Sequence, residues 1–263
     1  MWDRSWVPST AQLLPSMPGA PGVALRPWSP PDLGSPSGST RAVSFFDYLR
    51  KVPDYLADEW SRYVDLGRDH LEVVLVAMLI ATVLGVGLGI ATYRRPPAAK
   101  AVLTVTSTFL TIPSFALFGL FIPLFGLGYK PAVVALVMYA LLPIVRNTIT
   151  GLRGVDPAVS ESALGMGLSR TQRLWRIEMP LAWPVIITGL RVSTLLTVGI
   201  AAIAAIVNGP GLGGPIFQGL RATGTQRGFN QAFSGTLGVV VLALALDAAY
   251  LLLARLTTSK GLR

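Results

Sequence analysis

Five long apolar segments constrain the fold of this chain more than any other feature of its sequence. They cover about residues 71–93, 101–127, 132–150, 184–208 and 233–254. A helix of about 20 apolar residues crosses the hydrocarbon core of a bilayer, where each backbone polar group must find its partner within the segment. Only 13% of the residues are charged, against about 25% in a soluble domain. The sequence therefore predicts an all-α membrane protein with five transmembrane helices.

Regions of different composition flank these segments. Residues 1–44 are rich in Pro, Ser and Gly and show no helical or strand period, which predicts a disordered extension. Residues 45–70 mix aromatic and charged side chains, and we expect an amphipathic helix on the membrane surface there. The chain is thus divided into the extension, the interfacial helix, a transmembrane domain over 71–256 and a short tail, 257–263.

The basic residues indicate how the chain crosses the membrane. The net charge of +9 could suggest a nucleic-acid partner, but the basic residues fall in short loops between the apolar segments. The loop 94–100, the region 146–183 and the C-terminal tail hold eleven Lys and Arg, and the loops on the opposite side hold three. The positive-inside rule then predicts a multi-pass protein of the cell membrane with an outside N-terminus and a cytoplasmic C-terminus, and no nucleic acid is expected as a partner.

Residues with reactive or metal-binding side chains are scarce. The chain has no cysteine and a single histidine, His70. This composition disfavours a disulfide framework, a metal site and a histidine-based catalytic triad. We expect His70 to lie at a membrane interface, because it precedes the first apolar segment. The apolar segments hold no nucleophile–base pair, so a membrane enzyme is not favoured.

A polar stretch, residues 156–180, separates the third and fourth apolar segments. Asp156 suits the N-cap of a short helix and Pro157 its first position, where the missing N–H costs nothing. Gly165 and Gly167 follow and predict a sharp turn. The first half of the stretch is therefore expected to be a short helix that ends in a glycine turn.

A second short helix is expected after the turn. Ser169 and Gln172 have the spacing of a capping box, and three arginines follow within the next few residues. Pro180 is predicted to end this helix, because it cannot donate a hydrogen bond to the preceding turn. On local pattern alone, an ordinary basic cytoplasmic loop explains the stretch equally well.

The order of residues in this stretch resembles the EAA loop of ABC importer permeases. That loop reads Glu-Ala-Ala, three residues, Gly, nine residues, Ile, one residue, Leu-Pro. The chain reads Glu161-Ser162-Ala163, three residues, Gly167, nine residues, Ile177-Glu178-Met179-Pro180. In that family the loop forms a coupling helix that docks on a separate ATPase subunit. The resemblance implies that residues of this stretch couple the chain to an ATPase, namely Glu161, Ser162, Ala163, Gly165, Gly167 and Arg170.

Other segments resemble the glycine betaine, choline and carnitine branch of these permeases. They read TIPSFALFGLFIPLFGLG, PAVVALVMYALLPIVRNTITGL and NGPGLGGPIFQGL. The resemblance implies the five-helix permease core of the methionine- and molybdate-type importers. It also implies a homo- or heterodimer of permeases, two ATPase subunits and an extracytoplasmic substrate-binding protein. ATP and Mg would bind to the ATPase, so no cofactor is expected on this chain, which is a transport subunit and not an enzyme.

Several rival functions remain open from the sequence. The solute could be an osmoprotectant such as glycine betaine, choline, carnitine or proline, or else an amino acid or a sulfonate. An ion-gradient-driven transporter or a channel is disfavoured, because we find no clear internal repeat and Asp247 is the only carboxylate deep in an apolar segment.

Two sets of residues are candidates for the translocation pathway. The segment 101–127 is rich in hydroxyls and is interrupted by prolines, which free backbone carbonyls that need a partner or a wet cavity. A simple kinked helix would also explain this pattern. A glycine- and proline-dense stretch follows the fourth segment and suggests a hairpin on the outer side. The predicted pathway residues are Thr111, Pro113, Ser114, Phe115, Asn208, Gly209 and Gly211.

Two charged residues lie inside apolar segments. Arg191 and Asp247 are each about 10–14 Å from the predicted cytoplasmic end of their segments, at about 1.5 Å per residue. An ionisable group at this depth is costly and is usually paired. We therefore predict an ion pair between Arg191 and Asp247, while a snorkelling Arg191 and an Asp247 in a wet cavity remain the alternative.

Overall fold

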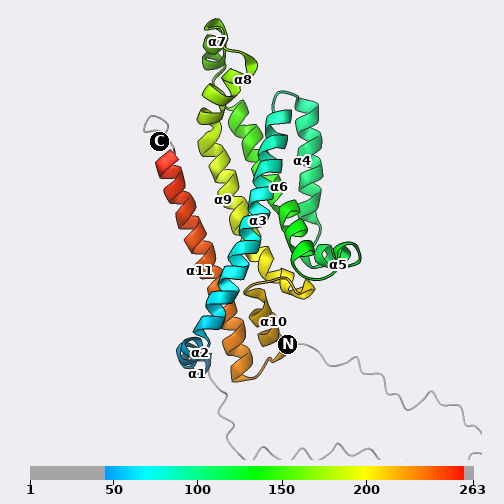
Figure 1. The fold of residues 1–263 in the computed structure, drawn as a ribbon, viewed down its shortest axis with the longest axis vertical. Coiled ribbons are helices and arrows are strands. Elements are labelled where there is room, and N and C mark those ends of the chain that lie inside the picture. Colours follow the sequence, from blue (N-terminus) through cyan, green and yellow to red (C-terminus); the bar gives the residue numbers. More distant parts are fainter. Residues whose placement is uncertain (1–44, 258–263) are drawn as a thin grey trace, which may run out of the picture. The chain divides into compact units, whose positions relative to one another are not determined.

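The computed structural model describes residues 45–257, and every element within that range is helical (Figure 1). The elements are α1 (Phe45–Arg50), α2 (Val52–Asp58), α3 (Trp60–Thr92), α4 (Pro96–Thr111), α5 (Ser114–Phe125), α6 (Tyr129–Arg153), α7 (Pro157–Gly165), α8 (Arg170–Arg173), the π-helical turn η2 (Leu174–Glu178), α9 (Met179–Ile203), the 3₁₀ turn η3 (Ala204–Val207), α10 (Gly213–Arg221) and α11 (Gln226–Thr257). The predicted extension 1–44 and most of the tail 257–263 lie outside the described residues.

Four continuous helices in the described range are long and apolar enough to cross a membrane. They are α3, α6, the helix that runs from Arg170 to Val207, and α11. The pair α4 and α5 would make a fifth span, but these two helices are bent by 97°. Four of the five predicted spans are therefore continuous helices, and the second is broken.

The break in the second predicted span has a local cause. Ile112 is extended with ψ 125°, as expected for a residue before proline, because the ring of Pro113 crowds the helical conformation. The hydroxyl of Tyr139 on α6 donates a hydrogen bond of 2.6 Å to the carbonyl oxygen of Ile112. A side chain from a neighbouring helix thus satisfies the carbonyl of Ile112, which lies outside the helical ladder at the break. The predicted interruption at Pro113 is therefore present, and the chain changes direction there by 97°.

Residues 45–70 do not form the single helix that was predicted. The structure divides it into α1, α2 and the first part of α3, which begins at Trp60, well before the apolar segment. Pro53 at the second position of α2 explains one boundary, because proline suits the start of a helix and not its interior. The first long helix therefore extends beyond the apolar run on its N-terminal side.

Helix α6 is the centre of the packing. It contacts α3, α4 and α9, and 78% of its most apolar stretch is buried (Figure 1). Gly85 and Gly89 of α3 let the two backbones approach: a Cβ at Gly89 would lie 2.5 Å from Cγ2 of Thr148 on α6. Helix α11 packs mainly on α10 and α9. In the single chain, none of the residues in its most apolar stretch is buried.

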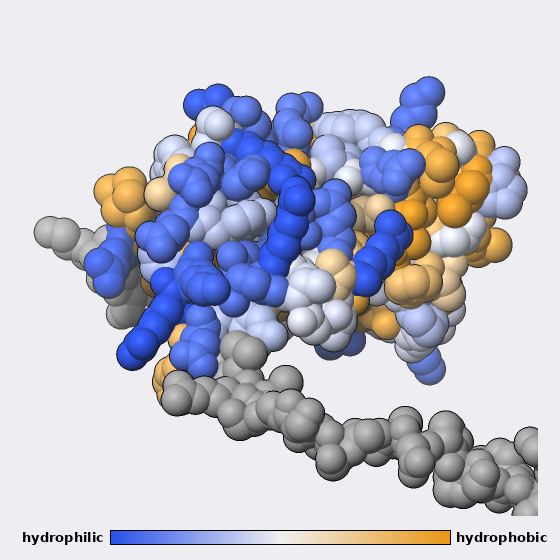
Figure 2. Space-filling model, turned by 90° about the horizontal axis from the view of Figure 1, so that it is seen from below, coloured by the Kyte–Doolittle hydropathy of each residue, from blue (hydrophilic) through white to orange (hydrophobic). Residues whose placement is uncertain are grey.

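The end of the molecule that carries α1, α2 and α10 has an uneven surface (Figure 2). Hydrophilic side chains cover much of this face, and hydrophobic ones gather on the side where Figure 1 places α5. Exposed apolar residues of α5 include Phe115, Leu120 and Leu124. Such a surface is suited to lipid or to a second protein subunit.

Candidate functional site

The polar stretch 156–180 forms a helical hairpin at one end of the molecule, where α7 and α8 lie beyond the long helices (Figure 1). Asp156 caps α7 as predicted: its carboxylate accepts a hydrogen bond of 2.8 Å from the backbone N–H of Ala158. Both halves of the capping box are present at α8, with 3.3 Å from Gln172 N to Ser169 Oγ and 2.8 Å from Ser169 N to Gln172 Oε1. The two predicted helix starts are therefore confirmed.

The turn between α7 and α8 depends on Gly167. Its φ of +79° lies in the left-handed region that side chains rarely adopt. The N–H of Leu168, the next residue, donates 3.1 Å to the carbonyl of Ala163 and closes the turn. Gly165 is the last residue of α7 and has a negative φ, so the reversal of the chain requires the second glycine and not the first.

Pro180 does not end the helix after the turn, which corrects the prediction. The chain stays helical from Arg170 to Val207, and Pro180 occupies the second position of α9. The π-helical turn η2 precedes it, in which the N–H of Met179 bonds to the carbonyl of Leu174, five residues back. Because α9 begins only after this wider turn, Pro180 lies in the first turn of α9, where a missing N–H is tolerated.

Glu178 is the centre of a buried polar cluster below this hairpin. Its side chain is 4% exposed. The hydroxyl of Tyr93 donates 2.6 Å to Oε2, and Nη2 of Arg94 donates 3.0 Å to Oε1. Nε of Arg173 lies 2.9 Å from Oε1, as an ion pair outside hydrogen-bonding geometry, and Ser160 Oγ donates 3.3 Å to the same oxygen. One carboxylate therefore joins the end of α3 to α7, α8 and η2.

The charged form of Glu178 is favoured by its surroundings. Burial raises the pKa of its carboxyl, but the hydrogen bond from Tyr93 and the charges of Arg94 and Arg173 outweigh burial and hold the pKa below its usual value. Glu178 lies before the predicted crossing segment 184–208, at the end of the molecule that carries the hairpin. The cluster extends to α6, because Arg153 Nε donates 2.7 Å to the backbone carbonyl of Tyr93.

The residues predicted to couple to an ATPase lie in two environments. Glu161, Ser162, Gly165, Gly167 and Arg170 are exposed on the hairpin. Ala163 is 1% exposed, so its methyl group packs inside the hairpin and does not face outward. Four large apolar side chains are exposed around them: Val159, Leu164, Met166 and Trp175. An exposed apolar surface with a carboxylate and arginines on it is suited to docking against another protein.

The two sets of predicted pathway residues lie on or next to elements that contact each other. Thr111, Pro113, Ser114 and Phe115 surround the break between α4 and α5, and Phe115 is 61% exposed. Asn208, with a left-handed φ of 56°, and Gly209 follow η3. Helix α5 packs on η3, and the N–H of Gly128 donates 2.6 Å to the carbonyl of Val207. Both sets therefore lie on the side of the molecule away from the hairpin.

His70 has a structural role that the sequence did not reveal. It is fully buried among the helices and is not an exposed polar residue. Its Nδ1 accepts a hydrogen bond of 3.3 Å from Leu212 N, and its Nε2 lies 3.1 Å from the carbonyl oxygen of Val198. One ring nitrogen thus accepts and the other donates, which specifies a neutral imidazole. Next to it, Gly211 has a φ of +113°, and a Cβ there would lie 2.7 Å from His70.

The predicted ion pair between Arg191 and Asp247 is present in the structure. Arg191 Nε lies 2.5 Å from Oδ1 and Nη2 lies 2.8 Å from Oδ2, so the contact is bidentate. The pair joins α9 to α11. The hydrogen bond from Thr194 to Tyr250 is a second polar contact between these two helices.

Replacing Asp247 by Asn is expected to lower the thermal unfolding midpoint of the purified protein. The change leaves Arg191 without its counter-charge within the membrane, which costs more than losing both partners. The R191M/D247L double variant, which removes both charges, is the control and is expected to lie closer to wild type. Equal unfolding midpoints for wild type and D247N would show that the pair does not hold the helices together.

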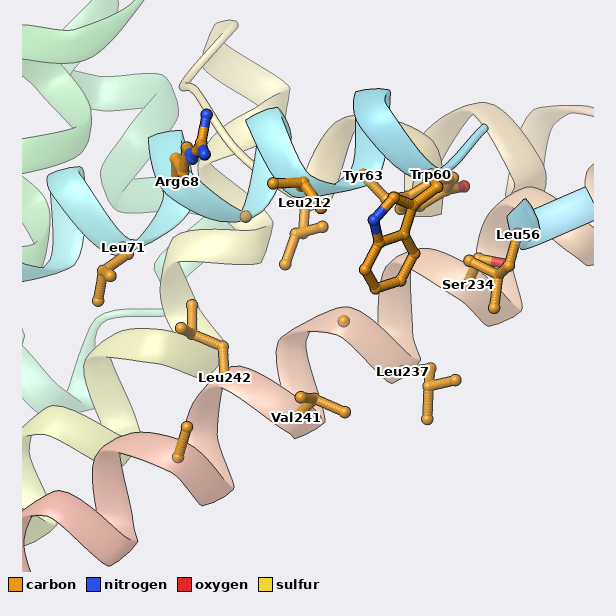
Figure 3. A pocket seen from close by; sticks show the side chains of 14 residues that line it. Leu56, Trp60, Tyr63, Arg68, Leu71, Leu212, Ser234, Leu237, Val241 and Leu242 are labelled. Atoms are coloured by element: carbon orange, nitrogen blue, oxygen red, sulfur yellow. The ribbon is translucent and has the colours of Figure 1, made fainter. Parts of the chain in front are cut away.

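An apolar pocket of about 430 Å³ lies between α2, α3, α11 and Leu212 (Figure 3). Trp60 and Tyr63 line one side, and Leu237 and Val241 line the other. Its only charged lining residue, Arg68, lies 3.4 Å from Asp65. The pocket is therefore lined almost entirely by apolar side chains, and we assign it no part in the candidate site.

Comparison with known proteins identifies the family to which the chain belongs. The protein family described as the binding-protein-dependent transport system inner membrane component matches residues 81–259. The chain belongs to this family. The match includes the hairpin, the Glu178 cluster and four of the five predicted spans in full.

Curated members of the family are similar over most of the chain. The glycine betaine/carnitine/choline transport system permease protein OpuCB of Bacillus subtilis is 37% identical over 195 residues, which is 74% of this chain and 88% of that protein. The osmoprotectant import permease protein OsmW of Salmonella typhimurium is 38% identical over 214 residues, 80% of this chain and 98% of that protein.

Solved structures support the predicted fold. The MetNI methionine ABC transporter in an inward-facing conformation matches with a TM-score of 0.66 and 22% identity, over 75% of this chain and 96% of that chain. An all-α permease of the methionine-importer type is therefore confirmed as the fold. At this level of identity the likeness concerns the fold alone.

Proposed function

We propose that this chain is the membrane-spanning subunit of an ATP-driven importer of osmoprotectants, with glycine betaine, choline, carnitine or proline as the solute. One observation carries the proposal: family members 35–38% identical over about three quarters of this chain are named as permeases for glycine betaine, carnitine and choline, for osmoprotectants, or for choline. Amino-acid and sulfonate importers are the alternative within the family.

The proposed partners follow from the surfaces of the chain. The exposed hairpin residues Glu161, Ser162, Gly167 and Arg170 would dock on a separate ATPase subunit, which binds ATP and Mg. A second permease subunit, identical or paralogous, would complete the solute pathway, and an extracytoplasmic binding protein would deliver the solute. The charge distribution supports a cytoplasmic hairpin and C-terminus, because the basic loops are on that side.

The chain's part in the mechanism would be alternating access. Closure of the ATPase dimer moves the two docked hairpins, and each hairpin is tied through Glu178 to the end of α3 and through η2 to α9. Movement of these rigid helices would then reopen the pathway on the outer side, near Thr111, Pro113, Ser114, Phe115, Asn208, Gly209 and Gly211. The Glu178 cluster offers a route for force because it links the hairpin to the end of α3 and to the start of α9.

Solute-stimulated ATP hydrolysis tests this proposal. The permease, its ATPase and its binding protein are reconstituted in vesicles, and glycine betaine, choline, carnitine and proline are added in turn. We expect stimulation by at least one of them. Stimulation by methionine or taurine alone would show that the solute is an amino acid or a sulfonate and not an osmoprotectant. Uptake that continues without ATP and follows an ion gradient would overturn the importer assignment.

A further inference from the structure

A basic groove lies between α4 and α6, at the end of the molecule that carries the hairpin. Its volume is about 300 Å³, and its polar lining consists of Lys100, Thr104, Ser107, Arg146 and Arg153. Pro96 and Leu103 contribute apolar walls. The groove differs from the pocket of Figure 3, since it combines cations and hydroxyls with apolar side chains.

The cations of the groove lack a carboxylate partner. Among the residues that the structure describes, Lys100, Arg146 and Arg153 take part in none of the ion pairs. Arg153 donates its Nε to the carbonyl of Tyr93, which leaves the charge of the guanidinium uncompensated. All three side chains are exposed, and three like charges around one groove favour the binding of an anion there.

The chain has few carboxylates that could serve as this anion. Only five Asp and Glu follow residue 70. Glu178 and Asp247 are engaged in ion pairs, and Asp156 caps α7. Glu161 is exposed on the hairpin, and Glu72 lies far along α3 from its hairpin end. A second copy of the chain would bring the same carboxylates and the same excess of positive charge, so it does not fit as the partner.

The position of the groove suits a lipid headgroup. Arg153 ends α6, and Arg146 lies seven residues earlier, about 10 Å deeper at 1.5 Å per residue. The lining residues of α4 run from Pro96, at its first position, to Ser107 along one helical face. The groove therefore starts at the level of the loops and leads toward the hydrocarbon core, as a headgroup and its acyl chains require.

We propose that this groove binds the headgroup of an anionic phospholipid of the cytoplasmic leaflet. Lys100, Arg146 and Arg153 surround the phosphate, and Thr104 and Ser107 add hydroxyl contacts. Pro96 and Leu103 pack against the start of the acyl chains. The inference rests on the proposed function only for the cytoplasmic side of the hairpin, where basic pockets between membrane helices meet anionic headgroups.

Native mass spectrometry of the purified transporter complex tests the proposal in the absence of solute and ATP. The probes are phosphatidylglycerol and phosphatidylcholine, titrated separately. We expect wild type to bind phosphatidylglycerol more tightly than phosphatidylcholine. Each cation removed from the groove should lower that affinity about fivefold, so K100Q/R146Q should bind about 25-fold more weakly. R95Q/R176Q removes two exposed cations outside the groove on the same side and should bind like wild type.

Three results would overturn the lipid site. Equal phosphatidylglycerol affinity in wild type and K100Q/R146Q would place the lipid elsewhere. An equal loss in R95Q/R176Q would reduce the effect to general surface charge. Loss of the ATPase or of the second permease subunit from K100Q/R146Q, with lipid binding unchanged, would show that protein covers the groove. Because the readout is lipid binding, these outcomes are independent of the solute test of the proposed function.

Discussion

Replacing Glu178 by Ala is expected to separate ATP hydrolysis from transport. The change removes the carboxylate that holds Tyr93, Arg94 and Arg173 together, and it leaves buried donors without an acceptor. Loss of a buried, charge-assisted cluster of this kind costs about 2–3 kcal/mol. The hairpin should then move without the spans, so ATPase activity would persist while stimulation by solute-loaded binding protein falls.

Two variants sharpen the test of Glu178. E178Q keeps an acceptor for Tyr93 but loses the charge, so it should lie between wild type and E178A in both thermal stability and coupling. S160A removes the longest contact to the carboxylate, at 3.3 Å, and should behave like wild type. Stimulation of E178A equal to that of wild type, in a complex of normal stability, would show that force does not pass through this cluster.

The pKa of Glu178 also predicts how its contribution depends on pH. Its pKa in the folded protein lies below the ordinary value of 4.5. The stabilisation is therefore complete above that ordinary value and is lost as the pH falls through the lower, folded pKa. Wild type should lose stability relative to E178Q over this acidic range. A constant difference between the two proteins at all pH values would contradict the charged cluster.

Replacing Gly213, the first residue of α10, by Ala is expected to have the largest effect on folding of any Gly-to-Ala change between η3 and α11. A Cβ at this position would overlap the carbonyl oxygen of Ala202, a backbone atom that cannot rotate away. Overpacking of this kind typically costs about 1–3 kcal/mol. We expect a lower unfolding midpoint and reduced yield of the intact complex in detergent.

The neighbouring glycine gives a matched control. A Cβ at Gly214 meets no atom within 4 Å, so G214A makes the same chemical change without the overlap. G214A should match wild type in yield and in unfolding midpoint. Equal effects of G213A and G214A would mean that the close approach of α10 to α9 does not limit packing at this point.

The long helices, the helix caps and the intramembrane ion pair could be predicted from the sequence. The apolar runs predicted the approximate places of the four continuous long helices, because backbone burial in lipid requires helices. Asp156 and Ser169 cap their helices as predicted, since a cap needs only residues a few positions away. Arg191 and Asp247 meet because each is costly in lipid without a partner.

The features that depend on tertiary contacts could not be predicted. At the break before Pro113, Tyr139 from another helix donates a hydrogen bond to the carbonyl of Ile112. His70 is buried because the chain after Val207 folds back beside it. Glu178 occupies the position of the loop pattern at which any residue is allowed, so the pattern does not predict a role for it. One signal was present: Glu178 is one of only five carboxylates after residue 70, in a region rich in arginine.

Glu161 gives the most direct test of the proposed coupling between the hairpin and an ATPase. ATPase activity and ATPase binding are measured in the reconstituted complex for wild type, E161A and S162A. We expect solute-loaded binding protein to stimulate wild type and S162A, which restores the Ala of the resembling loop, and to leave E161A unstimulated. Full stimulation of E161A, or a wild-type chain that binds no ATPase, would contradict the account.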